Sequence, residues 1–292
     1  MQSSLLDTLF LSEKRKELLL FLKDGTKNSD DIKTAFDFPW KSMIPQIKKL
    51  VEWDLISYKN GICSLTTMGE VIVENMERFL MTLKTHELYR NYWLEHDLSP
   101  IPKKLICRIG ELGHCEILEP TLPDIFEQQE EILRRMDGSD RIMTFVSVYH
   151  PAQLIILSEF IEHGTRLDLI MTEDVYKIVK GDIRPNLSLI QNENSIFTSL
   201  KEEYEKEIGN LFEDKLSEIF VYRGNLKPLT IIVTDKFLSM TLLSKGGKYD
   251  NSSIMSSEPS AISWGEALFT HYKERSDRLT ETERCSIRKI EN

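Results

Sequence analysis

Residues 38–68 read FPWKSMIPQIKKLVEWDLISYKNGICSLTTM, and this stretch decides the fold. Counted at 100° per residue, its first half separates into an apolar and a polar side, as in an amphipathic helix. Proline is tolerated in the first turn of a helix, so Pro45 predicts a helix that begins near Ser42, as its N-cap, and runs to about residue 54. The predicted apolar side consists of Met43, Ile44, Ile47, Leu50 and Val51.

Two short strands are predicted after this helix, over 55–58 and 62–65. Asn60-Gly61 joins them and favours a type I′ turn, because both central residues of that turn need positive φ. Two further helices are predicted before this one, over residues 12–23 and 30–35. Asn28 or Ser29 is the predicted N-cap of the second. Three helices followed by a hairpin predict an α+β winged helix-turn-helix.

The polar side of the 42–54 helix suits the major groove of DNA. Lysine neutralises phosphates, and glutamine can pair bidentately with adenine. We therefore expect double-stranded DNA as a partner, contacted by Lys41, Ser42, Gln46, Lys49, Lys59 and Asn60. The alternative is a winged helix that binds only proteins, or one that serves as the dimerisation domain of an enzyme.

A long connecting helix is predicted over 68–95. It contains an apolar stripe with spacings of four, three and four residues, as a seam between two helices requires. The stripe consists of Ile72, Met76, Phe79 and Leu83. Packing within its own domain is the alternative. We expect a homodimer, because a winged-helix monomer covers too little DNA for specific binding.

The formal net charge of the 292-residue chain is −10, and it is unevenly distributed. Residues 1–60 contain ten Lys and Arg against nine Asp and Glu, which leaves 27 against 38 in the rest of the chain. A near-neutral N-terminal module on an acidic body fits a regulator better than a protein that coats nucleic acid indiscriminately. Four cysteines, no signal peptide and no apolar run of about 20 residues predict a cytoplasmic protein without a membrane span.

The second half alternates between strands and helices. Residues 141–149 and 166–171 are predicted strands, and a helix over 152–162 gives them the length of a parallel crossover. Further helices are predicted over 174–180, 197–211 and 260–278, and further strands over 187–191, 218–222, 229–233 and 237–243. The sequence thus predicts an α/β domain with a central mixed sheet over 98–279, after an N-terminal domain over 1–97. A solvated tail is predicted over 280–292.

Polar residues follow three of the predicted strands. Ligands of open α/β sheets bind beyond the carboxyl ends of the strands, where the loops converge. We therefore predict a small-molecule effector pocket lined by Tyr149, His150, Thr172, Glu173, Thr234 and Asp235, with Trp264 as an aromatic wall. The alternative is that these residues only form turns and helix caps.

Motifs for catalysis are absent or incomplete. The second half resembles half of a phospholipase-D-like fold, whose enzymes use His-x-Lys-x4-Asp, but His271-Tyr272-Lys273 has its aspartate, Asp277, one position early. Gly110-Glu111-Leu112-Gly113 lacks the glycine pattern of a methyltransferase. We predict no catalytic residue. A methyltransferase-like or phosphodiesterase-like enzyme is the alternative function.

Cys107, His114 and Cys115 fall within nine residues and are the strongest candidates for metal ligands. They lack Cys-x-x-Cys spacing, and a fourth ligand would have to come from a distant part of the chain. We therefore predict buried structural cysteines, no metal and no cofactor. A redox role for Cys107 and Cys115 stays open.

Several motifs along the chain are those of one family. They include Ser12-Glu13-Lys14-Arg15-Lys16, Pro45-Gln46-Ile47-Lys48-Lys49-Leu50, Tyr92-Trp93, His96-Asp97-Leu98, Arg108-Ile109-Gly110-Glu111-Leu112-Gly113, Val233-Thr234-Asp235 and Trp264-Gly265-Glu266. Over residues 4 to about 276 the chain resembles archaeal winged-helix regulators of methanogens, which carry a methanogenesis-regulator (filamentation-regulator type) middle domain. The resemblance implies a DNA-binding transcriptional regulator whose middle domain senses a signal, and it names no ligand residue.

Overall fold

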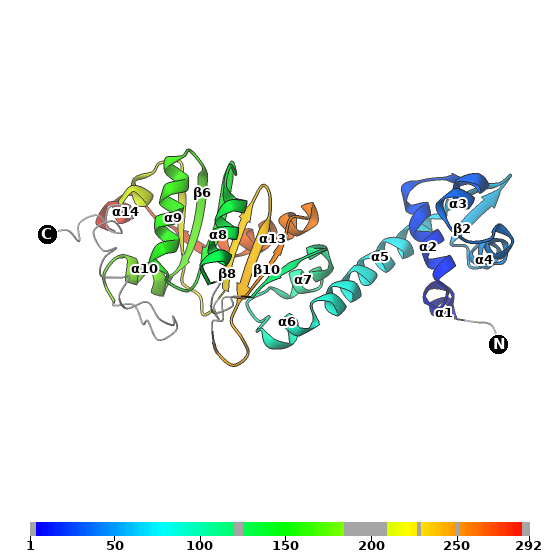
Figure 1. Ribbon diagram of the computed structural model, residues 1–292, viewed down its shortest axis with the longest axis horizontal. Helices are drawn as coiled ribbons and strands as arrows, with labels where there is room; N and C mark the ends of the chain where they lie inside the picture. The colour runs from blue at the N-terminus through cyan, green and yellow to red at the C-terminus, as the bar shows by residue number, and fades with distance from the viewer. Residues whose placement is uncertain (1–3, 120–124, 184–208, 227–228, 249–251, 288–292) are drawn as a thin grey trace. The chain divides into compact units, whose positions relative to one another are not determined.

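The structure, a computed structural model, describes residues 4–119, 125–183, 209–226, 229–248 and 252–287 (Figure 1). The contacts between residues divide the chain into two compact units, Met1–Leu83 and Lys84–Asn292. The division falls inside a helix, and each unit is described by itself. Within the described residues, even the longest helix, of 22 residues, lacks the apolar character of a bilayer-spanning segment.

The first unit is a winged helix preceded by one additional helix. Its small antiparallel sheet has the strand order β1-β3-β2, in which the two wing strands lie next to each other. In chain order the elements are α1 (Leu5–Phe10), α2 (Glu13–Phe21), η1 (Leu22–Asp24), β1 (Lys27–Asn28), α3 (Ser29–Ala35), α4 (Trp40–Glu52), β2 (Ile56–Lys59), β3 (Ile62–Leu65) and α5 (Thr67–Leu88). The predicted α+β winged helix is therefore confirmed.

Local side-chain chemistry explains where these elements begin and turn. Asn28 caps α3 in a capping box with Asp31, in which each side chain accepts from the other residue's backbone N–H. Asn60 and Gly61 have φ of 54° and 78°, as the predicted type I′ turn requires. Helix α1 was not predicted from the sequence, although Ser4 and Asp7 form a second capping box at its start.

Helix α4 differs from its prediction in start and orientation. It begins at Trp40 with Pro39 as N-cap, so Ser42 is not the cap and Pro45 lies in the second turn. Only a narrow stripe faces the core, consisting of the buried Met43, Ile47 and Leu50. Ile44 and Val51 were predicted to be inward and are instead 39% and 42% exposed, because they flank this stripe.

Gly69 shows how tightly the wing packs against the start of α5. A Cβ at this position would lie 1.9 Å from the carbonyl oxygen of Leu55. That oxygen accepts a hydrogen bond from the backbone N–H of Thr66, so it is held in place. Since no side chain fits between the two segments, the position requires glycine.

The helix predicted over 68–95 is broken at Tyr89, where φ is −113° and ψ is 28°. It is replaced by α5 and the short α6 (Arg90–Glu95). The aromatic side chains around the break are buried in the core of the second unit. Trp93 Nε1 donates to the carbonyl oxygen of Thr85, and Tyr92 Oη donates to that of Met240. These contacts tie the segment after the break to the core of the second unit.

The second unit is built on a mixed sheet of eight strands in the order β11-β7-β6-β5-β8-β9-β10-β4. β7, β6 and β5 are parallel, and the other neighbours are antiparallel. In chain order the strands are β4 (Glu116–Leu118), β5 (Arg141–Val146), β6 (Arg166–Thr172), β7 (Glu218–Tyr222), β8 (Leu229–Thr234), β9 (Leu238–Leu242), β10 (Ser253–Ser256) and β11 (Ser276–Arg278). The predicted central mixed sheet is confirmed.

Helices cover both faces of this sheet (Figure 1). α9 (Pro151–Glu162) and α10 (Glu173–Val179) pack on one face with α8 (Ile125–Met136), around one apolar cluster. α13 (Pro259–Lys273) covers the other face, together with α7 (Lys103–Ile106) and η2 (Ile109–Leu112). Helix α9 connects β5 to β6, and these two strands are parallel, as predicted.

Three predictions for this unit need correction or fall outside the structure. The last helix ends at Lys273, and 276–278 form an edge strand against β7 instead of continuing it. The tail predicted to be solvated contains α14 (Glu281–Ile287), whose Ile287 is buried and whose Arg284 donates to two backbone carbonyls. The strand predicted over 187–191 and most of the helix over 197–211 lie outside the described residues.

Candidate nucleic-acid interface

The exposed face of α4 is the first part of the candidate interface. Because Met43, Ile47 and Leu50 hold the helix against the core, the opposite side is turned to solvent. The exposed residues on that side are Lys41, Ile44, Pro45, Lys48, Val51 and Glu52. Neither lysine forms a salt bridge within the described part of the chain. The predictions included Lys41 but missed Lys48, although its spacing of seven residues from Lys41 indicates the same face.

Ser42 and Gln46 were predicted to contact DNA, but they are turned toward α2. Lys14 Nζ donates to Ser42 Oγ at 2.8 Å, and Arg15 Nη1 donates to Gln46 Oε1 at 2.6 Å. Both side chains are partly buried, and so is the predicted Lys49 on the same flank of α4. The side of α4 that carries these residues therefore forms the contact with α2, not the centre of the outward face.

Arg15 joins three elements of the first unit. Besides Gln46 on α4, its guanidinium donates to the carbonyl oxygens of Asp7 at 3.2 Å and Thr8 at 2.5 Å in α1. One planar group thus satisfies two backbone carbonyls and also fixes an amide, through donors on three separate nitrogens, a fixed fork that the compact ammonium of lysine lacks. The rotation of α4 about its own axis is held in this way by a residue 31 positions earlier.

The wing is the second part of the candidate interface. Lys59 and Asn60 are exposed at the tip of the β2–β3 hairpin, as predicted. The hairpin is tied to α3, because the backbone N–H and the hydroxyl of Ser29 both donate to the carbonyl oxygen of Gly61, at 2.9 and 3.1 Å. The wing tip is therefore held in a fixed position relative to the helices of its own unit.

The stripe predicted for dimerisation divides between core and surface. Met76 is buried in the core of the first unit and Ile72 is half-buried against it, whereas Phe79 and Leu83 are 52% and 40% exposed. The ring of Phe79 meets Phe10 of α1 edge-on, with centroids 5.9 Å apart. Leu6, four residues before Phe10, and Leu11, directly after it, are 68% and 78% exposed. We call Leu6, Leu11, Phe79 and Leu83 the α1–α5 patch.

The residues predicted to line an effector pocket lie at two opposite ends of the central strands. Tyr149 and His150 follow β5, and Thr172 and Glu173 end β6, so these four share the edge at which the parallel strands end. Thr172 is the N-cap of α10, and Glu173 pairs with Arg223 at 2.8 Å.

Thr234 and Asp235 lie at the other edge, because β8 is antiparallel to β5 and Thr234 pairs with Ile142. Thr234 Oγ1 accepts from two backbone N–H groups of the following turn, and Asp235 Oδ1 accepts from Asp140 N. These two residues form and brace a turn. The carboxyl-end rule applies only to strands that run in the same direction, which explains why the prediction combined two separate places.

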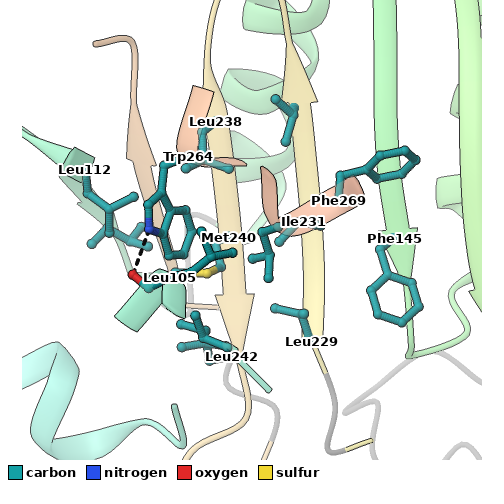
Figure 2. Close-up of a cluster of buried hydrophobic side chains, with 14 of the residues drawn as sticks. Leu105, Leu112, Phe145, Leu229, Ile231, Leu238, Met240, Leu242, Trp264 and Phe269 are labelled. Carbon is teal, nitrogen blue, oxygen red and sulfur yellow. Dashed lines mark hydrogen bonds between the residues drawn. The ribbon is translucent and has the colours of Figure 1, made fainter. Parts of the chain in front are cut away.

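Trp264, predicted as an aromatic wall of the effector pocket, lies in the core of the second unit. It is fully buried in the cluster under α13, between Leu105, Leu112, Leu238 and Met240, and its Nε1 donates to the carbonyl oxygen of Leu105 at 3.0 Å (Figure 2). The buried ring and its satisfied N–H make it the centre of a core.

The structure shows what surrounds the candidate metal ligands Cys107 and Cys115 and two members of the incomplete catalytic motif, Tyr272 and Lys273. Cys115 is buried, which raises the pKa of its thiol to about 12, whereas Cys107 is exposed. No group of three His, Cys, Asp or Glu side chains is placed to hold a metal among the described residues. Tyr272 Oη donates to the Pro100 carbonyl, and Lys273 pairs with Glu218 at 2.6 Å.

The fold combines a winged helix with a second domain built on a mixed α/β sheet. Comparison with known families matches residues 3–84 to the N-terminal domain, and residues 125–194 and 186–275 to the middle domain, of the methanogenesis regulatory protein FilR1. The chain belongs to this family of regulatory proteins.

A curated relative is the methanogenesis regulatory protein FilR1 of Methanothrix harundinacea (strain 6Ac), which is 25% identical over 273 residues. The match covers 92% of this chain and 57% of the relative, so the chain spans little more than half of the relative's length. Similar solved structures include TrmBL2, an archaeal chromatin protein (TM-score 0.37, 11% identity, 92% of this chain and 94% of that chain). Another is Nuc from Salmonella typhimurium, a phospholipase D family member (TM-score 0.35, 13% identity, 57% of this chain and 99% of that chain).

Proposed function

We propose that this protein is a sequence-specific, DNA-binding transcriptional regulator of a methanogenic archaeon, acting as a homodimer in the cytoplasm. The observation that carries the proposal is the outward face of α4, where Lys41 and Lys48 are exposed without a salt bridge among the described residues; Lys59 is exposed as well, at the wing. The family's character as methanogenesis regulatory proteins supports genes of methanogenesis as targets.

The chemistry of this face suits a major groove. Lys41 and Lys48 lie about two turns apart and would neutralise phosphates, which sets affinity and register. Ile44 lies between them and offers an apolar surface that fits the methyl group of thymine. The acidic remainder of the chain, 27 Lys and Arg against 38 Asp and Glu after residue 60, opposes indiscriminate binding.

Binding to DNA from upstream of its own gene tests the proposal. Fluorescence anisotropy with a labelled duplex should show tight binding whose log affinity falls linearly with log salt. A shuffled duplex of the same composition is the control and should bind at least tenfold more weakly. Equal affinity for both duplexes, or no binding at low salt, would contradict a sequence-specific regulator.

We propose that dimerisation through the α1–α5 patch supplies the second winged helix, which would bind the second half-site of the DNA. Large exposed apolar side chains gathered in one place are typical of interaction surfaces. Replacing Phe79 and Leu83 with aspartate should yield monomers in sedimentation equilibrium and weaken operator binding, because two half-sites about 34 Å apart need two winged helices. Met76 is left unchanged, since it belongs to the core.

The matched control for this experiment is Val71→Asp. Val71 is 51% exposed on the same helix, but it lies 80° around the helix axis from Phe79 and therefore outside the stripe. This variant should stay dimeric. A wild-type protein that sediments as a monomer at micromolar concentration would count against the proposed dimer.

We also propose that the second domain binds a small-molecule effector at the carboxyl ends of β5 and β6, where Tyr149, His150, Thr172 and Glu173 lie. Thr172 Oγ1 is buried there without a hydrogen-bond partner among the described residues, as expected of a group that awaits a ligand. Thr172→Val, which keeps the shape of the side chain, should abolish any change in DNA affinity caused by metabolite extract and leave basal binding intact. A response equal to that of the wild type would refute this placement.

A further inference from the structure

Charged side chains gather at the amino ends of three neighbouring strands, on the sheet face that α13 covers. Arg141 of β5 is the register partner of Arg166 of β6, and Asp168 of β6 is the register partner of Glu218 of β7. Arg278 of β11 pairs with Phe220, which belongs to the cluster under α13. Side chains alternate between the faces of a sheet, so these five groups point to the same side.

Two carboxylates at this place are surrounded by four cations. Asp168 is fully buried, accepts a hydrogen bond from Arg141, and has Lys273 at 3.6 Å and Arg166 at 3.9 Å. Glu218 pairs with Lys273 at 2.6 Å and Arg278 at 3.1 Å. The pKa of Glu218 is lowered, mainly by the hydrogen bond from Lys273. We call these six side chains the Arg141–Arg278 cluster: Arg141, Arg166, Asp168, Glu218, Lys273 and Arg278.

The cluster has two positive charges more than its carboxylates neutralise. One cation for each carboxylate is already in hydrogen-bonding contact, Arg141 on Asp168 and Lys273 on Glu218. Arg166 and Arg278 are additional, and their side chains are 55% and 62% exposed, so both are accessible to a ligand. Arg141 Nε is buried without a partner among the described residues, which leaves a further donor unused.

Other charged groups lie around the cluster. Asp277, next to Arg278, is paired with Arg223 at 2.9 Å, and the charges of Asp214 and Glu281 act on Arg284. Arg284 adds a cation that donates to two backbone carbonyls, and its pKa is lowered by burial and by the charge of Arg278. Like charges on adjacent strands are destabilising, so a counter-anion would relieve this arrangement.

We propose that the Arg141–Arg278 cluster binds the phosphate group of a small anionic ligand. A phosphate dianion matches the surplus of two charges, and its oxygens accept the parallel N–H bonds that guanidinium groups donate. The site lies at the edge of the sheet opposite Thr172 and Glu173, and it is independent of the proposed DNA face. The ligand is either inorganic phosphate or a phosphate monoester, since the recognised group is the same.

Calorimetric titration of the full chain, without DNA, tests this proposal. The ligands are inorganic phosphate and glycerol phosphate, with sodium chloride at equal ionic strength as the blank. The test variant is R166Q with R278Q, which leaves the contacts of Arg141 and Lys273 in place. We expect saturable binding to the wild type and an affinity at least tenfold lower in the variant, because two charge-assisted contacts are lost.

The matched control is Arg275→Gln, which removes an exposed arginine that pairs with Glu274 outside the cluster. It should bind phosphate as the wild type does. Binding of both ligands points to the phosphate group alone, and binding of glycerol phosphate only points to a monoester. Heat no greater than that of chloride, or an equal loss in both variants, would overturn the proposal. It would also be overturned if the double variant bound phosphate as the wild type does but lost DNA affinity in a parallel anisotropy titration, which would identify a contact to the DNA backbone.

Discussion

Replacing Trp264 with alanine is expected to lower the free energy of unfolding of the second unit by about 3 to 5 kcal/mol, the largest stability effect anticipated here. The ring is fully buried, and it fills the space between α13 and the β8–β9 part of the sheet (Figure 2). Its removal leaves a cavity and also leaves the carbonyl oxygen of Leu105 without its donor. Hydrogen–deuterium exchange of peptides from β8 and β9, with far-UV circular dichroism in denaturant, would measure the loss in this unit.

Two other variants separate the contributions to this loss. Trp264→Phe keeps most of the apolar contact but loses the hydrogen bond. It should therefore lower the free energy of unfolding by less than Trp264→Ala does. Leu216→Ala is the matched surface control, because Leu216 is a large apolar side chain of the same unit that is 71% exposed, and its effect should stay within about 0.5 kcal/mol. A cost below about 1 kcal/mol for Trp264→Ala would mean that the ring is not a core residue.

Replacing Lys41 and Lys48 together with alanine is expected to produce the largest loss of DNA affinity. Each phosphate contact contributes about 0.9 to the slope of log affinity against log salt, so a homodimer that loses four contacts should lose about 3.6 units of slope. At 0.1 M salt this corresponds to a loss of roughly a thousandfold or more. Anisotropy titrations at several salt concentrations would measure both quantities.

The matched control removes the same charge from another part of the unit. Lys16 and Lys23 are paired with Glu13 and Glu77, so replacing them with alanine should change the slope little. Gln46→Ala should leave base preference unchanged, because its amide is held by Arg15. A folded Lys41/Lys48 double variant with an unchanged salt slope would show that the outward face of α4 does not meet DNA.

The two functional surfaces proposed for the first unit meet at Arg15. Its guanidinium connects α1, which carries part of the α1–α5 patch, with Gln46 on the helix that is proposed to read DNA. The proposed dimer contact and the orientation of α4 therefore share a structural element, although the two would be tested by different substitutions.

The winged helix could be predicted from the sequence alone because its signals are local. Asn60-Gly61 specifies a turn through the φ angles of two adjacent residues, and Asn28 with Asp31 specifies a helix start within four residues. The alternating strands and helices from Arg141 onward were also evident, since periodicity is a property of short segments. Neither result depends on a residue far away in the chain.

Only the tertiary structure decided which way these elements face. Gln46 turns inward because Arg15 binds it, and Trp264 enters a core because Leu105, 159 positions earlier, accepts its N–H. Because β8 runs in the opposite direction to β6, Thr234 lies at the other end of the sheet from Thr172. The sequence pattern of neither strand records this direction. The rotation of a helix and the direction of a strand depend on packing partners that the periodicity of one segment does not record, and the candidate sites depend on both.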